Sequence, residues 1–172
     1  MDFISMAKLE NTKIVARCEA EFAGKLQVDG EPHGLLTLIA QPEDILTILE
    51  FLKTDPELSF AFLTDITAVH YPELDKPFCV VYHLHSWANR SRVRIKVFLE
   101  GKHPVIASAT TLWDGANWME RETYDFYGVR FTGHPDLRRI LNVDDMEAFP
   151  MRKEHPLEDP NRVDKKDYFF GR

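Results

Sequence analysis

The side chains best suited to chemistry are concentrated in the segment ERETYDFYGVRFTGHPDLRRIL, residues 120–141. Acids, arginines, a histidine and aromatic rings are mixed there, which is unusual both for a solvated charge run and for a packed core. Glu120 and Glu122 lie two residues apart on a predicted helix, so their side chains diverge. Their spacing therefore disfavours a paired general acid and base.

His134 and Asp136 are the other pair with catalytic potential, as a base and the acid that orients it. Pro135 followed by Asp136 is more typical of a turn, and no serine or cysteine nucleophile stands nearby in the sequence. We therefore expect no catalytic residue in this segment. The alternative of a free-standing enzyme that uses His134 with Glu120 or Asp136 stays open.

Two non-catalytic interpretations of the segment remain. In the first, solvated ion pairs join Glu122 or Asp125 to Arg138 or Arg139. In the second, the segment is an interface scaffold, because guanidinium forks bind carboxylates through two parallel hydrogen bonds that fix orientation. Rings and charges on several sides of the predicted helix favour the second, since a helix on a sheet needs one apolar stripe. We predict that removing Arg138 or Glu122 impairs assembly more than any intrinsic reaction.

Two other clusters come from the predicted strands. His83 and His85 share a strand face and could provide two metal ligands. Without a third ligand nearby, we expect partly exposed histidines and no metal site. Arg92, Arg94 and Lys96 share a face of the next strand, which we interpret as a solvated face or, second, as a surface for an acidic partner.

Periodicity and breaker residues predict an α+β fold: a single, mainly antiparallel sheet with packed helices and an extended C-terminal tail. The predicted helices cover residues 10–23, a segment that starts near residue 42, and residues 114–127. The predicted strands form a hairpin within residues 25–40 and then cover residues 60–71, 78–86 and 92–99, the last two paired as an antiparallel hairpin. Asp65 interrupts the first of these long strands, which a bulge or a local backbone hydrogen bond explains.

The sequence predicts an α+β domain at residues 1–149 and a partner-docking tail at residues 150–172. The tail is rich in proline and charge and shows no helical or strand period, so we expect it to run over a surface. Tyr168, Phe169 and Phe170 indicate docking, either back on the domain or on a neighbour.

Composition excludes several classes of protein. A chain of 172 residues with 44% hydrophobic residues suits one folded domain, and its net charge of −7 argues against a general nucleic-acid binder. Only Cys18 and Cys79 are present, whereas an iron–sulfur cluster needs about four thiolates. No apolar run approaches the roughly 20 residues that span a bilayer, and the first residues are not typical of a signal peptide.

Several motifs resemble the C subunit of the proton-pumping NADH:quinone oxidoreductase, respiratory complex I. The segment ERETYDFYGVRFTGHPDLRRIL resembles the signature of that family. LSFAFLTDITAVHYPE, VVYHLHS, RVRIKVFL and LWDGANWMERE are similar to the family in the same order, and FPMRKEHPL resembles its closing element. The resemblance covers about residues 35–157.

This resemblance implies a hydrophilic subunit of the peripheral arm that has no catalytic, cofactor-binding or metal-binding residue. FMN, iron–sulfur clusters and quinone are then expected in partner subunits, especially those that form the quinone site and hold the nearby clusters. The chain would lie peripheral to the membrane, on the cytoplasmic side in bacteria or the matrix side in mitochondria. The residues that match the signature and the closing element, all expected in structural or interface roles, are Glu120, Arg121, Glu122, Asp125, His134, Asp136, Arg138, Arg139, Arg152 and Lys153.

Two further alternatives stay open at this point. Related subunits occur in membrane-bound hydrogenases and in complexes fed by other electron donors, and one subunit does not name the donor. A soluble adaptor that never meets complex I is the other possibility.

Overall fold

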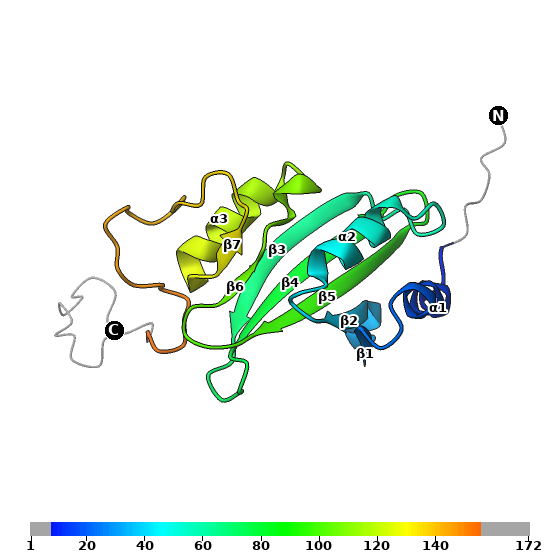
Figure 1. Cartoon of the computed structure of the whole chain (residues 1–172), viewed down its shortest axis with the longest axis horizontal. Helices are drawn as coiled ribbons and strands as arrows, with labels where there is room; N and C mark the ends of the chain where they lie inside the picture. Colours follow the sequence, from blue (N-terminus) through cyan, green and yellow to red (C-terminus); the bar gives the residue numbers. More distant parts are fainter. Residues whose placement is uncertain (1–7, 156–172) are drawn as a thin grey trace, which may run out of the picture.

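The computed structural model describes residues 8–155. Its centre is a five-stranded mixed sheet in the order β1-β2-β5-β4-β3 (Figure 1). The strands are β1 (Leu26–Gly30), β2 (Leu36–Ala40), β3 (Phe62–His70), β4 (Phe78–Ser86) and β5 (Ser91–Leu99). Neighbouring strands are antiparallel except β2 and β5, which are parallel. This parallel pair joins the N-terminal hairpin to the β3–β5 meander.

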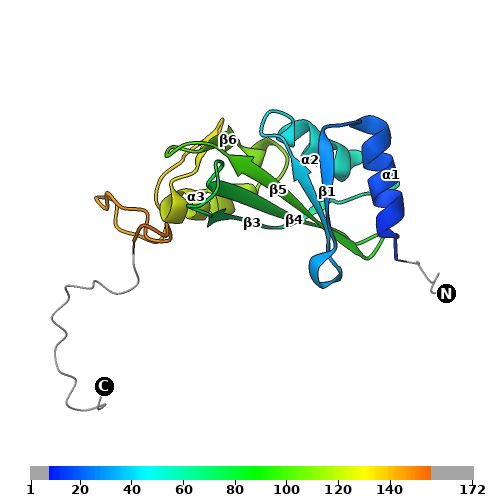
Figure 2. The same cartoon turned by 90° about the horizontal axis from the view of Figure 1, so that it is seen from below.

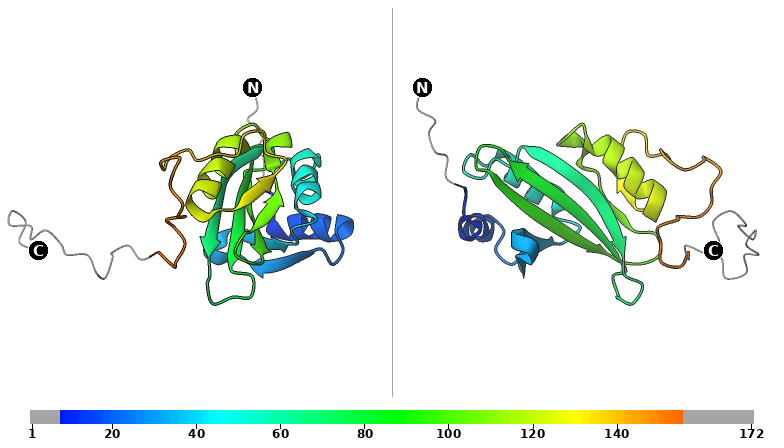
Figure 3. Two further views of the ribbon diagram at one scale, coloured as in Figure 1. Left: turned by 60° about the vertical axis from the view of Figure 1, so that its left-hand side comes forward. Right: turned by 180° about the vertical axis from the view of Figure 1, so that it is seen from behind.

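Three α-helices pack around this sheet: α1 (Asn11–Glu21), α2 (Ile45–Thr54) and α3 (Ala116–Tyr127). α2 lies in front of β4 and β5, while α3 lies beside β3 and α1 lies near β1 (Figures 1 and 2). Strand alternation creates the covered face: Val93, Ile95 and Val97 are buried, whereas Arg92 just before them is exposed. In the view from behind, β3, β4 and β5 lie in front of α2 (Figure 3, right).

A second, two-stranded sheet holds the segments before and after α3 together. Its strands β6 (Val105–Ala107) and β7 (Arg130–Thr132) are parallel. Two short 3-10 turns complete the described elements, η1 (Pro32–Gly34) and η2 (Ala109–Thr111). β6 and β7 were not predicted from the sequence, because three residues are too few to show a strand period.

The predicted α+β fold is confirmed, together with most of its elements. The hairpin within residues 25–40 is the antiparallel pair β1–β2, and β4 and β5 form the predicted antiparallel hairpin. The register of β3 with β4 shifts between Leu63 and Asp65, which agrees with a bulge, one of the two explanations for Asp65. α1 ends at Glu21, earlier than expected, and Gly24 follows with a φ of +80°.

The first residues of the predicted tail lie against the domain. The N–H of Met151 donates to the carbonyl of Phe126 at 3.2 Å, and the N–H of Lys153 donates to Nδ1 of His70 at 3.0 Å. A domain boundary near residue 150 and a docking role for the tail stay predictions. The aromatic cluster at residues 168–170 lies outside the described residues.

Candidate functional site

Helix α3 carries the first half of the charged segment and packs along β3. Thr123 anchors the helix, because its hydroxyl donates to the carbonyl of Ile66 in β3 at 3.2 Å. The helix ends at Gly128, whose φ of +74° is the left-handed conformation that glycine adopts without strain. Charged side chains are among the buried positions of this helix, namely Glu120, Arg121 and Asp125. Each of these buried charged groups needs a hydrogen-bond or ion-pair partner.

Asp125 is the centre of the site, with a side chain that is 0% exposed. One carboxylate oxygen accepts hydrogen bonds from the backbone N–H groups of residues 140, 141 and 142 at 3.1, 2.8 and 2.9 Å. The other oxygen accepts from Nη1 of Arg139 at 2.7 Å and from the side-chain amide of Asn142 at 3.0 Å. One carboxylate therefore fixes three consecutive peptide groups and two side chains of the following loop.

The surroundings of Asp125 decide its charge state. Burial alone would raise the pKa of Asp125, but the hydrogen bonds from Asn142, Arg139 and Leu141 outweigh it and hold the pKa well below its usual value. The carboxylate is therefore ionised at physiological pH. Asp125 and Arg139 form a buried pair and not the solvated pair of the first interpretation, since their side chains are 0% and 8% exposed.

Arg139 extends this network along the loop. Besides Asp125, its guanidinium donates to the backbone carbonyls of Met146 and Ala148, the latter at 3.0 Å. Its guanidinium carbon also lies 5.1 Å from the ring centre of Phe149. Arg139 thus ties the start of the loop to its end.

Arg121 of α3 also binds the backbone of this loop. Its Nε donates to the carbonyl of Arg138 at 3.2 Å, and its Nη2 donates to the carbonyl of Arg139 at 2.9 Å. The guanidinium carbon of Arg121 lies 5.5 Å from the ring centre of Trp118. We call residues 136–149 the signature loop, because Arg121, Asp125 and Arg139 together fix its backbone.

The closing element packs onto the C-terminal end of α3. Nε of Arg152 donates to the carbonyl of Tyr127 at 2.7 Å, and the guanidinium lies between the rings of Phe78 and Phe149, at 4.8 and 4.6 Å. A Cβ on Gly128 would lie 2.5 Å from Nη2 of Arg152, so only glycine allows this approach.

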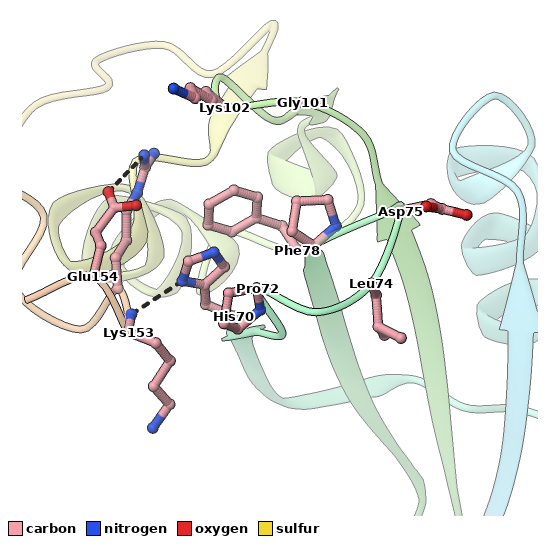
Figure 4. A pocket seen from close by; sticks show the side chains of 11 residues that line it. His70, Pro72, Leu74, Asp75, Phe78, Gly101, Lys102, Lys153 and Glu154 are labelled. Carbon is pink, nitrogen blue, oxygen red and sulfur yellow. Dashed lines mark hydrogen bonds and ion pairs between the residues drawn. The ribbon is translucent and has the colours of Figure 1, made fainter.

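Figure 4 shows where this element meets the sheet. The backbone N–H of Lys153 donates a hydrogen bond to the ring of His70, and the guanidinium of Arg152 forms an ion pair with Glu154. The ring of His70 is stacked on Phe78 at 4.5 Å, and burial lowers the pKa of this histidine. The neighbouring hollow of about 380 Å³ is lined by both signs of charge, including Lys102, Asp75 and Glu154. The contacts here join the closing element to the β3–β4 turn.

Glu120 belongs to a separate network on the other side of α3. Its carboxylate accepts from the hydroxyl of Ser108 and from the N–H of Ala109, both at 2.6 Å. Burial raises the pKa of Glu120 to about 7, against the opposing effect of these two hydrogen bonds. Tyr82 is fully buried, and its hydroxyl has no hydrogen-bond partner among residues 8–155. Glu120 therefore connects α3 to η2 and is half-ionised near neutral pH.

His134 is held by the backbone at both ring nitrogens. Its Nδ1 accepts from the N–H of Asp136 at 3.0 Å, so Nε2 carries the proton that meets the carbonyl of Asn117 at 3.1 Å. The carboxylate of Asp136 instead pairs with Arg138 at 2.8 Å. The arrangement is a turn and not a base with its orienting acid, so the geometry gives no support to catalysis by His134.

The remaining signature side chains are exposed. Glu122, Asp136, Arg138 and Lys153 all face outward. The exposed pair of Asp136 and Arg138 contributes little to stability, about 0–1 kcal/mol. An interface role for these four stays a prediction, whereas Arg121, Asp125, Arg139 and Arg152 have structural contacts within the chain.

The exposure of several apolar side chains on and near the signature loop was not predicted from the sequence. Leu141 and Val143 on the signature loop are 64% and 66% exposed, and Ile140 is 36% exposed. Trp118 on α3 adds a ring that is 60% exposed. In the sequence, the apolar pair Ile140-Leu141 is typical of the end of a buried element. No local pattern shows that Asp125 binds the backbone of this pair and leaves its side chains exposed.

His83 and His85 both lie against other side chains of the sheet. His83 accepts from Nε of Arg94 at 2.9 Å and lies 3.7 Å from Asp65, while the ring of His85 lies tilted against that of Trp87, with centres 4.3 Å apart. Both histidines are partly exposed, as predicted. Within residues 8–155, no three potential ligands group in a way that could hold a metal ion. None of the helices in this range is long and apolar enough to span a membrane.

The sequence of this chain matches the model of a known protein family. The family model for "Respiratory-chain NADH dehydrogenase, 30 Kd subunit" matches residues 38–161. The chain belongs to this family. The match includes the signature loop and its partners on α3.

Known relatives of the 30 Kd family are similar over most of their length. The C subunit of NADH-quinone oxidoreductase from Roseiflexus castenholzii is 44% identical over 149 residues, which cover 87% of this chain and 86% of that protein. The corresponding protein of Citrifermentans bemidjiense is 44% identical over 153 residues, with 89% and 94% covered. The family resemblance found in the motifs is therefore confirmed.

Solved structures agree on the fold. The trypsin-resistant fragment (1-134) of Nqo5 superposes with a TM-score of 0.61 at 30% identity, covering 73% of this chain and 98% of that one. A chain of the membrane-bound sulfane sulfur reductase, an archaeal respiratory membrane complex, gives a TM-score of 0.72 over 92% of this chain and 98% of that one. Its identity is 20%, so this likeness shows the fold alone.

Proposed function

We propose that this chain, a peripheral-arm subunit of NADH-quinone oxidoreductase, is a scaffold that catalyses no step by itself. In this proposal it takes part in electron transfer from NADH to quinone, coupled to proton pumping, by holding other hydrophilic subunits in place. FMN, iron–sulfur clusters and the quinone site then belong to those subunits. The chain lies peripheral to the membrane, on the cytoplasmic side or, in a mitochondrion, the matrix side.

One observation carries the proposal: a buried ionic network holds a loop that displays apolar side chains to solvent. Asp125 and Arg139 fix the backbone of the signature loop, while Leu141 and Val143 point outward. Losing one partner of such a buried pair costs about 3–5 kcal/mol, so the loop is held firmly. Rigid apolar side chains lower the entropy lost on binding and suit a permanent interface.

The chemistry of the signature supports scaffolding over catalysis. Both ring nitrogens of His134 are bonded to backbone groups, and Asp125 is saturated with hydrogen bonds. A group engaged in this way has no free lone pair for a substrate. The names of the relatives at 44% identity favour the NADH-linked complex over the hydrogenase-type and adaptor alternatives.

The test replaces Leu141 and Val143 by aspartate in cells that rely on this subunit. Because both side chains are exposed in the free chain, the doubly substituted subunit folds but does not co-purify with the detergent-extracted complex. NADH:quinone activity of the membranes falls with it. Val28→Asp is the matched control, since Val28 is also exposed (45%) but lies in β1. Normal co-purification and activity of the double variant would contradict the proposal.

A further inference from the structure

A second charged region lies away from the signature loop, near α1 and the turn between β4 and β5 (Figures 1 and 2). A groove of about 670 Å³ runs there between the start of α1, the β1–β2 turn and the first residues of β5. The basic side chains that line it, here called the basic groove, are Lys8, His33, His85, Arg90, Arg92 and Arg94. Among the described residues no carboxylate lines the groove, although the chain has a net charge of −7.

The charges of the basic groove are not neutralised within the described part of the chain. Arg90 and Arg92 are exposed, and neither forms an ion pair with a carboxylate in residues 8–155. Arg94 donates to the neutral ring of His83. Glu10 and Glu31 line an adjacent hollow, which shares Lys8 and Asn11 with the groove. A hollow lined by one sign of charge focuses the field and attracts the opposite charge.

An exposed aromatic surface continues from the basic groove. Trp87, one of its lining residues, is 67% exposed, and its ring lies 4.3 Å from that of His85 and 5.9 Å from that of Phe62. Phe62 is itself 46% exposed. Tryptophan and arginine together are among the residues most enriched at the energetic centres of protein interfaces. An inorganic anion needs only the cations, whereas a peptide with acidic and apolar side chains uses both surfaces.

We propose that the basic groove and Trp87 bind an acidic, extended segment of a neighbouring subunit. This inference rests on the proposed function, because the neighbour belongs to the same complex. Carboxylates of the segment pair with Arg90 and Arg92, and an apolar side chain packs on Trp87. The signature loop and the basic groove lie at different ends of the molecule, so the subunit joins two partners (Figure 1).

The first experiment identifies what lies on Trp87 in the intact complex. A photo-crosslinking phenylalanine replaces Trp87, the assembled complex is illuminated, and the crosslinked peptides are identified by mass spectrometry. A peptide of another subunit that is rich in Asp and Glu supports the proposal. A lipid adduct, a neutral or basic peptide, a peptide of this chain alone, or no crosslink overturns it.

The second experiment tests the charge. Arg92→Glu lowers the recovery of the assembled complex by about tenfold, since a repulsive pair replaces an attractive one. Lys102→Glu is the matched control, with the same change of charge at an exposed position outside the groove. Replacing the facing acid of the crosslinked segment by lysine restores assembly of Arg92→Glu. Unchanged assembly of Arg92→Glu, or no restoration by the swap, overturns the proposal.

The third experiment separates this inference from the proposed function, because it uses the purified full-length chain alone. A synthetic peptide of glutamates and leucines binds the wild type, and added salt weakens the binding, as measured by calorimetry. The Arg92→Glu variant binds about tenfold more weakly. A lysine–leucine peptide, inorganic phosphate and anionic vesicles serve as probes of the other occupants. Equal or tighter binding of any of these overturns the inference while leaving the proposed function in place. Absence of the wild-type chain from the complex overturns the proposed function, even where the acidic peptide still binds the groove.

Discussion

The signature loop and the basic groove both owe their character to arginine, but they use it in opposite ways. Arg121 and Arg139 are engaged in contacts inside the chain, to backbone carbonyls and to Asp125. Arg90 and Arg92 at the groove are exposed and have no carboxylate partner in the described residues. At the signature loop, the internal contacts of arginine hold a backbone whose apolar side chains are exposed. At the basic groove, the unpaired arginines form a surface that attracts negative charge.

The comparison shows that a charged residue type does not reveal its role. A guanidinium is structural where acceptors within the chain, carbonyls or a buried carboxylate, take its hydrogen bonds, and it is free for a partner where they do not. Asp125 is the difference between the two regions, since its burial brings Arg139 and three peptide N–H groups together. Changes at Asp125 and at the groove therefore have different effects, which the following substitutions measure.

Asp125→Ala is expected to have the largest effect on stability. It leaves the buried guanidinium of Arg139 without its opposite charge and three loop N–H groups without their acceptor, so we expect the free energy of unfolding to fall by about 3–5 kcal/mol. Urea unfolding at neutral pH measures this change. Asp136→Ala is the matched control, because its pair with Arg138 is exposed and its loss costs about 0–1 kcal/mol. Equal effects of the two substitutions would remove the distinction between buried and exposed pairs.

Glu120→Gln is expected to change how stability depends on pH. Burial raises the pKa of Glu120 to about 7 from its usual 4.5, so the folded state holds a proton that the unfolded state has lost between these values. The wild type therefore loses up to about 3 kcal/mol as pH rises from about 4.5 to about 7, and the Gln variant lacks this contribution. Thermal or urea unfolding of both proteins at several pH values gives the difference. A constant difference across this range contradicts the assignment.

Gly128→Ala tests the packing of the closing element on α3. Gly128 and Gly101 have nearly the same φ, +74° and +73°, but only a Cβ at Gly128 would meet Arg152 and Phe149. Gly101→Ala thus reports the backbone strain alone, and we expect Gly128→Ala to be less stable than it by about 1–3 kcal/mol. Urea unfolding of the two variants provides the comparison. Equal stability would mean that Arg152 does not pack against this glycine.

Arg92→Glu is expected to have the smallest effect on the free chain. The side chain is exposed and unpaired within the described residues, so the free energy of unfolding changes by no more than about 0.5 kcal/mol. Its effect appears in assembly instead. The same unfolding measurement checks this, and a loss comparable to that of Asp125→Ala would show that the groove is held together as tightly as the signature loop.

Much of the fold could be predicted because its signals are local. β5 alternates apolar and basic residues along most of its length, and Gly128 marks the end of α3. β6 and β7 are too short for a period and pair across 25 residues, from Val105 to Arg130, so no local pattern shows them. The parallel pairing of β2 with β5 is equally non-local.

The site could be predicted only as a set of residues. The motifs identified Asp125, Arg138 and Arg139 as special, but not which of the two arginines the acid meets. That choice depends on how the chain turns after β7, where Asp125 binds Arg139 while Arg138 turns outward to Asp136. The exposed apolar side chains follow from the same turn, so their role could not be read from the sequence.

A structure of the intact NADH-quinone oxidoreductase with this protein in place gives the most direct test of a scaffold built on the signature loop. We expect Leu141 and Val143 to be covered by another subunit, while the carboxylate of Asp125 keeps its contacts with Arg139 and the loop N–H groups. Solvent around both side chains in the assembled complex, or a rearranged Asp125, would contradict the account.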